Sequence, residues 1–192
     1  MKNFLCILLI AAACLITGCS SAGERGQLIQ SGKYFSVSEG TPPSEVHYKI
    51  YDESGNVVLS ESTDRPLSIT MADESTVDIS EGMGSGLTRH VYYDTENNLF
   101  SDAFYYVVCT SDDLVAYIGS SQNDSSQNTT LIVRDIFEKE DFYKEFHPDF
   151  SETSLYDLSA VEGAFSKDQS SLNITYASEE RQTSVSQSFE LK

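Results

Sequence analysis

The sequence predicts an all-β fold, an antiparallel β-sandwich or barrel with one short helical insertion near residues 138–147. Three observations support this prediction. From residue 33 onward, apolar residues mostly recur at every second position, which is the period of a half-buried strand. The candidate strands follow one another at intervals of roughly ten residues, as in sandwiches and barrels. Residues typical of turns separate them.

The first clear strand pair lies in residues 45–61. In the segment EVHYKIY, the apolar positions 46, 48 and 50 alternate with the polar positions 45, 47 and 49. The turn segment DESGN follows, and VVLSES then continues the apolar pattern. These features predict a β-hairpin with His47 on its solvated face.

The remaining strands are predicted from further alternating or continuously apolar segments. These are PLSITM, TVDIS, RHVYYD, LFSDAFYYVVC, LVAYIG, TTLIVRDIF, SLNITYA and SVSQSFEL. The glycine-rich segment EGMGSG (81–86) lies between two of them. Because its flanks are strands and Glu81 would repel a phosphate, we expect a hairpin loop or a bulge there.

One segment, FEKEDFYKEFHPDF, departs from the strand period. Phe142 and Phe146 are four positions apart and Pro148 follows, which predicts a short helix. His147 would then lie at the negative end of the helix dipole.

The first 19 residues have the features of a secretory signal. Lys2 precedes thirteen apolar residues (4–16), a run shorter than the roughly 20 residues of a membrane-spanning helix. The next residues complete the motif Ile16-Thr17-Gly18-Cys19, which resembles the lipobox of bacterial lipoproteins. The resemblance implies that residues 1–18 are a signal peptide that is removed. It also implies that Cys19 carries diacylglycerol with acyl chains such as palmitate.

This resemblance implies an extracytoplasmic protein, lipid-anchored to a bacterial membrane of the cell envelope. We expect residues 19–32, which are small, polar and glycine-rich, to form a flexible tether. Residues 33–192 would form a single acidic all-β domain. Residues 86–192 are also similar to small bacterial lipoproteins of unassigned function, a resemblance that carries over no catalytic or binding residue.

The charge excludes several functions. The chain has 30 Asp and Glu against 12 Lys and Arg, a formal net charge of −18. This acidity argues against a nucleic-acid partner, whose phosphates require Lys and Arg, and disfavours lying flat on an anionic membrane. Cys109 is the only cysteine left for the folded domain, and its apolar segment predicts a core residue.

Few residues indicate chemistry. His90 could act as a base near Asp94, or be a half-exposed strand residue. The spacings HExxH, GxSxG and CxxC are absent from the sequence. Asp52-Glu53 and Asp112-Asp113 offer the oxygen ligands that calcium prefers, although Asp is also common in turns. We therefore expect no catalytic residue, no resident metal and no cofactor.

The function predicted from these observations is that of a non-enzymatic binding domain for a protein or glycan partner, held at the membrane by lipid. Eleven tyrosines could supply a contact platform, or serve as ordinary strand residues. Two alternatives stay open. One is an envelope hydrolase with an unrecognised site. The other is an inhibitor or immunity lipoprotein that binds a cationic protein.

Overall fold

The protein is all β, as predicted. The computed structural model describes residues 26–40, 45–120, 129–148, 150, 157–178 and 183–192. Within these ranges, fifteen strands form four antiparallel sheets, and one 3₁₀ helix spans Asp157–Ala160. The described strands close no barrel, so the arrangement is that of stacked, sandwich-like sheets.

Each sheet is a meander of consecutive strands. The first sheet contains β1 (Leu28–Ser31), β2 (Phe35–Glu39), β3 (Val46–Tyr51) and β4 (Val57–Thr63). The second contains β5 (Leu67–Met71), β6 (Thr76–Gly84), β7 (Leu87–Asp94) and β8 (Leu99–Tyr105). The third contains β9 (Val107–Ser111), β10 (Leu114–Gly119), β11 (Thr130–Asp135) and β12 (Tyr143–Phe146). The fourth contains β13 (Glu162–Phe165), β14 (Ser171–Ser178) and β15 (Thr183–Glu190).

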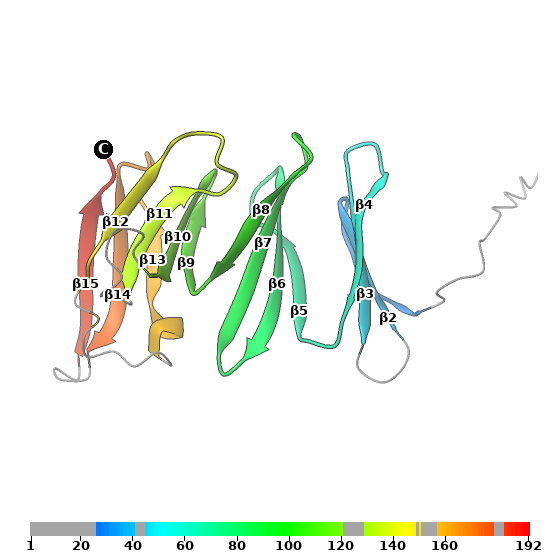
Figure 1. The fold of residues 1–192 in the computed structure, drawn as a ribbon, viewed down its shortest axis with the longest axis horizontal. Coiled ribbons are helices and arrows are strands. Elements are labelled where there is room, and N and C mark those ends of the chain that lie inside the picture. The colour runs from blue at the N-terminus through cyan, green and yellow to red at the C-terminus, as the bar shows by residue number, and fades with distance from the viewer. Residues whose placement is uncertain (1–25, 41–44, 121–128, 149, 151–156, 179–182) are drawn as a thin grey trace, which may run out of the picture.

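The sheets follow one another along the longest axis of the molecule, in chain order (Figure 1). A hydrophobic cluster lies between each neighbouring pair. Ile50 and Ile79 belong to the cluster between the first and second sheets, and Leu131 and Ile174 to that between the third and fourth. The middle cluster is the smallest, with five buried members: Tyr92, Phe104, Val115, Ile136 and Phe137. The junction of the second and third sheets is therefore the least apolar of the three.

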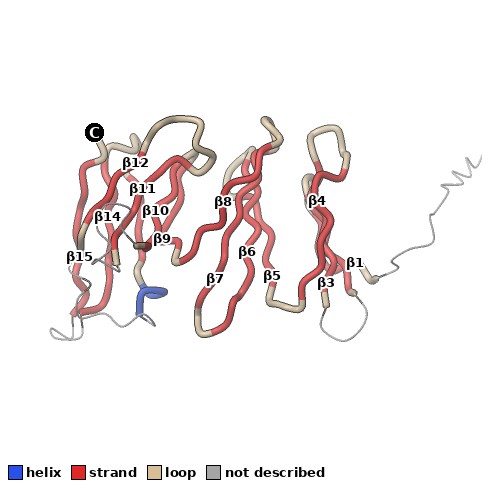
Figure 2. The backbone as a smooth tube through the Cα atoms, viewed as in Figure 1, coloured by secondary structure: helices blue, strands red, loops and turns tan. Residues whose placement is uncertain are grey.

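The second and third sheets are covered on both faces (Figure 2). Adjacent residues of β7 show this directly. Tyr92 is 1% exposed in the middle cluster, whereas Tyr93 is 0% exposed in the cluster shared with the first sheet. Because successive strand side chains point to opposite faces, each inner strand supplies two cores.

The helix predicted near residues 138–147 is wrong. Tyr143–Phe146 is instead strand β12, which pairs with β11. Phe142 and Phe146, four positions apart, share a face in a strand as well as in a helix, and both pack against the third–fourth cluster. The unpaired edge of β11 decides between the two structures, because pairing satisfies its backbone groups.

Two further boundaries differ from the prediction. Residues 99–109 form two strands rather than one, because Tyr106 has a positive φ of 49° and the chain passes there from the second sheet to the third. The predicted tether is wrong for Leu28–Ser31, which is strand β1 paired with β2. The hairpin in residues 45–61 and the glycine-rich hairpin with a bulge at Gly82–Gly84 are confirmed.

The fourth sheet approaches the third closely at β13. A Cβ atom on Gly163 would lie 2.5 Å from Val108 Cγ1 and 3.2 Å from Cys109 Sγ. We expect Gly163→Val to lower the free energy of unfolding by about 1–3 kcal/mol through overpacking, measured by urea denaturation. Ala164→Val, at the neighbouring exposed position, should change it by less than about 0.5 kcal/mol. Equal effects of the two substitutions would contradict this packing.

Candidate functional site

Acidic turns gather at one edge of the sheet stack. In a meander each strand reverses direction, so every second turn lies at the same edge. The turns β3–β4, β5–β6 and β7–β8 lie together at the upper edge in Figure 1. The acidic pairs at this edge are Asp52-Glu53, Asp73-Glu74, Asp94-Glu96 and Asp112-Asp113.

A cleft of about 410 Å³ opens at this edge between the second and third sheets. Its lining residues are Asp73, Glu74, Ser75, Thr76, Asp94, Glu96, Asp112, Asp113 and Lys139. We call this hollow the acidic cleft. Six carboxylates thus surround a single ammonium group, so the cleft is suited to cations.

Ionic contacts hold the two sheets together beside the small middle cluster. Lys139 donates a hydrogen bond to Asp94, and its Nζ lies 4.0 Å from Asp113 Oδ1. Arg134 Nη2 lies 3.8 Å from Asp102 Oδ2, and the guanidinium lies 5.6 Å from the centre of the Phe104 ring. The cleft begins where apolar contact between these sheets ends.

Asp94 is the best-enclosed carboxylate of the cleft, with its side chain 4% exposed. It accepts the backbone amides of Glu96 and Asn97, both at 2.9 Å, and the Asn97 side-chain amide at 2.8 Å. Burial alone would raise the pKa of Asp94, but the hydrogen bonds from Lys139 and Asn97 outweigh it and hold that pKa below its ordinary value. The hydrogen bond to Asp94 raises the pKa of Lys139.

The other carboxylates of the cleft divide into two kinds. Asp73 Oδ1 accepts the backbone amides of Ser75 and Thr76 at 2.7 and 2.8 Å, so it shapes its own turn. The rest are exposed: Glu74, Glu96, Asp112 and Asp113. These exposed groups give the cleft a negative charge that a ligand can reach.

The acid–base hypothesis pairing His90 with Asp94 is wrong. His90 Nδ1 lies 3.1 Å from both carboxylate oxygens of Asp78, across the β6–β7 pair. Its ring stacks against Tyr92, with centroids 6.2 Å apart. Asp94 is bound to Lys139 instead, so the two residues belong to different contacts.

The other two histidines and Cys109 lie apart from the cleft. His47 is on the outer face of the first sheet, hydrogen-bonded to the Ser62 hydroxyl. His147 is exposed beyond β12, so its predicted place at a helix end is wrong. Cys109 packs against the third–fourth cluster as predicted, and burial raises its pKa to about 12. Cys19 lies outside the described residues.

In each of the two calcium candidates, one aspartate accepts hydrogen bonds from the protein itself. Asp52 accepts the backbone and side-chain amides of Asn56 at 2.8 and 2.9 Å. Asp112 Oδ2 accepts the Gln169 amide at 2.8 Å. Within the described part of the chain, no three His, Cys, Asp or Glu side chains come together in an arrangement that could hold a metal ion.

Lys139 was not predicted as a site residue, because its segment was predicted to form a helix. The position of the acidic turns at the same edge of the sheets was not predicted either. One signal was available. The acidic pairs begin at Asp52, Asp73, Asp94 and Asp112, at intervals of 18 to 21 residues. With strands recurring about every ten residues, this interval spans two strands and places the pairs at one edge.

Comparison of the chain with protein-family models and with curated proteins found no match. Among the described residues, no helix is long and apolar enough to cross a membrane.

The Lys139–Asp94 pair makes a testable contribution to stability. Lys139→Met would leave the buried Asp94 carboxylate without its ammonium partner. We expect this substitution to lower the free energy of unfolding by about 1–2 kcal/mol at pH 7. The value is at the low end for a buried pair because solvent screens a lysine side chain that is 34% exposed. Urea unfolding monitored by circular dichroism measures it, with the exposed Lys167→Met as the control of equal charge change.

The loss should depend on pH in a defined direction. The pKa of Asp94 is lowered by folding, so its stabilisation is present above 3.8 and disappears as pH falls through the folded value. The pKa of Lys139 is raised by folding, so its stabilisation is present below 10.5 and disappears at higher pH. A difference between variant and wild type that does not shrink on acidification below pH 4 would contradict the assignment.

Proposed function

We propose that the protein is a lipid-anchored, non-enzymatic binding domain of a bacterial cell envelope, whose acidic cleft receives a basic segment of a protein partner. The observation that carries this proposal is the cleft itself, with six carboxylates and one lysine between two sheets. It favours the alternative of an inhibitor or immunity lipoprotein with a cationic partner.

The cleft already accommodates an ammonium group of the chain. Lys139 is hydrogen-bonded to Asp94 there, so a lysine or arginine side chain from a partner would meet similar chemistry at the exposed carboxylates. A neutral glycan would leave these charges unused. The net charge of −18 would also steer a cationic protein toward this surface and raise its association rate.

Hydrolysis has weaker support than binding. Among the described residues, a His–carboxylate hydrogen bond joins His90 and Asp78 on neighbouring strands. The His90 ring also stacks on Tyr92, so both contacts hold it in the sheet. The small hollow beside it holds about 110 Å³ and is lined by Gly86, Thr88, His90, Tyr106 and Val107. This hollow offers little room for a substrate beside the histidine.

The anchor is proposed from the motif Ile16-Thr17-Gly18-Cys19, which lies outside the described residues. Two or more acyl chains at Cys19 would hold the domain stably at a membrane, because each buried CH₂ contributes roughly 0.8 kcal/mol. A tethered binding domain meets its partner at a high local concentration.

Neutralising the exposed carboxylates tests the cleft. For Glu74→Gln/Glu96→Gln/Asp113→Asn, we expect binding of a fluorescent decalysine peptide to weaken about tenfold at 50 mM salt, measured by anisotropy. The matched control Glu39→Gln/Glu162→Gln/Glu190→Gln removes three exposed charges away from the cleft and should weaken binding by less than about threefold. Equal losses would identify unspecific attraction and overturn the cleft as the site.

Replacing the lipidated residue tests the anchor. We expect Cys19→Ala to move the protein from the membrane fraction to the soluble fraction, because the acyl chains are lost. Chemical cross-linking on intact cells should yield a discrete partner with the wild type and lose it in the cleft variant. A Cys19→Ala protein that stays wholly with membranes would contradict lipidation.

A further inference from the structure

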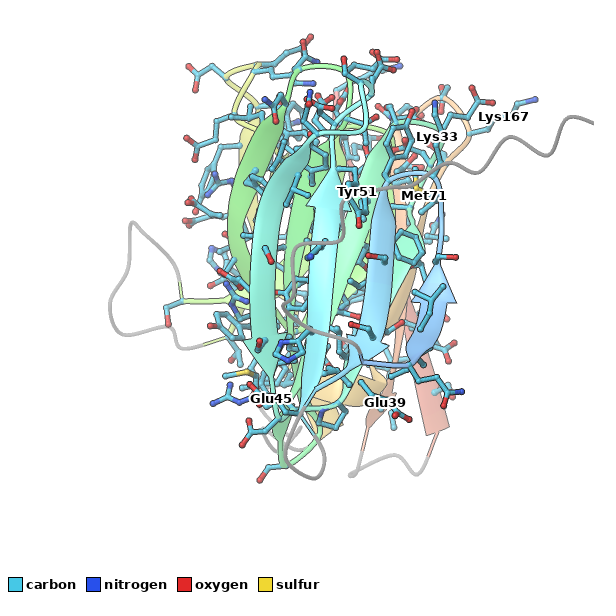
Figure 3. All side chains as sticks on the ribbon, turned by 90° about the vertical axis from the view of Figure 1, so that its right-hand side faces the viewer. Lys33, Glu39, Glu45, Tyr51, Met71 and Lys167 are labelled. Atoms are coloured by element: carbon cyan, nitrogen blue, oxygen red, sulfur yellow. The ribbon has the colours of Figure 1, made fainter. Side chains whose placement is uncertain are left out.

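The outer face of the first sheet differs from the rest of this acidic chain. The strand registers and the alternation of side chains place ten residues on it: Leu28, Ser31, Ser36, Ser38, His47, Lys49, Tyr51, Val57, Ser60 and Ser62. None of them is a carboxylate. Figure 3 looks onto this face, with Tyr51 near its upper end and Glu39 and Glu45 only at its lower margin.

The strand residues on the outer face of the fourth sheet differ in charge from those on the first. Among the described strand residues, the outer face of the fourth sheet carries Glu162 and Glu190 but neither Lys nor Arg. The outer face of the first sheet carries Lys49 and His47. The adjoining turns add Lys33, Asp52 and Glu53 at the first sheet and Lys167 and Asp168 at the fourth, so the difference lies in the faces and not in the turns.

The first sheet also has the most exposed large apolar side chains of the described residues. Leu28 and Ile29 in β1 are 59% and 56% exposed, the two highest values among the large apolar residues described. Seven peptide units separate Cys19 from Gly26, where the described chain begins, and even fully extended they span at most about 25 Å. A lipid on Cys19 would thus keep β1 close to the bilayer.

We propose that the outer face of the first sheet docks on the anionic headgroups of the membrane to which Cys19 is anchored. This inference rests on the lipid anchor of the proposed function. Leu28, with Ile29 beside it at the bulge of β1, enters the interfacial layer. Lys49 faces lipid phosphates, and Tyr51 supplies an amphipathic ring at headgroup depth. The anchor holds the protein at the membrane, and this face sets its orientation.

The net charge of −18 does not prevent this orientation. Face-to-face sheets lie about 10 Å apart, so the acidic cleft, behind the second sheet, stands roughly 20 Å from the docked face. Charges separated by more than a Debye length of about 8 Å are largely screened. Docking through the first sheet therefore leaves the cleft at the side of the molecule, beyond the screening length from the anionic lipids and open to a partner.

Matched labels on the two end faces test the proposal. Ser31→Cys and Ser186→Cys place a fluorophore at exposed serines on the first and fourth sheets, in the lipidated chain reconstituted in vesicles with 30% anionic lipid. We expect headgroup-level quencher lipids to quench the label at position 31 at least about threefold more than that at 186. Lys49→Glu, or Leu28→Ser with Ile29→Ser, should bring this ratio close to one, whereas the exposed Lys167→Glu should not.

Three results would overturn the inference, and they differ from one another. Equal quenching at both positions on floated vesicles keeps the anchor but removes the preferred face. A chain that does not float with vesicles overturns the anchor, and this inference with it. A fluorescence change at position 31 that persists without vesicles and grows with protein concentration identifies a second copy as the occupant of the face.

Discussion

The structure depends on one constraint, which is that the two inner sheets must bury both faces. Their strands therefore carry two apolar sets in alternation, as Tyr92 and Tyr93 show by entering different clusters. Where the residues facing a neighbouring sheet are charged rather than apolar, each charge needs an ionic or hydrogen-bonding partner. A buried charge without a partner lowers the free energy of unfolding. Lys139 and Arg134 meet that need at the junction of the second and third sheets. The acidic cleft is the solvent-facing margin of this polar junction.

Most strands could be predicted because apolar and polar residues alternate where one face of a sheet is solvated, as in the hairpin of residues 45–61. The errors arise where that period is ambiguous or hidden. Phe142 and Phe146 fit both a helix and a strand, and only the open edge of β11 selects the strand. Tyr106 has a positive φ that ends the strand, but residues 99–109 contain no glycine or proline from which a break could be predicted. β1 looks like a tether because an exposed edge strand has no buried face to pattern its residues. The order of the stacked sheets could not be predicted either. Alternation of apolar residues indicates that a face of a strand is buried, but not which sheet packs against it.

The candidate site was visible in part. Acidic turns stand out in the sequence, but aspartate in a turn is ordinarily a backbone cap, and Asp73 and Asp94 do cap their turns. The hydrogen bonds of Asp73 and Asp94 are sufficient to cap the two turns. Glu74, Glu96 and Asp113 line the cleft and add charge that the turns do not use for capping, and the proposed binding site rests on this additional charge. Lys139 could not be found from sequence, because its contact with Asp94 joins residues 45 positions apart.

The charge difference between the outer faces of the first and fourth sheets connects the two proposals. A uniformly acidic domain tied by a short tether would be repelled by the anionic surface to which it is anchored, in every orientation. In the proposed orientation, the strand residues of the docked face include Lys49 and His47 and no carboxylate, so much of that repulsion is absent there. In that orientation the first and second sheets separate the cleft from the lipids by more than the screening length. The same acidic residues can then attract a cationic partner without opposing the anchor.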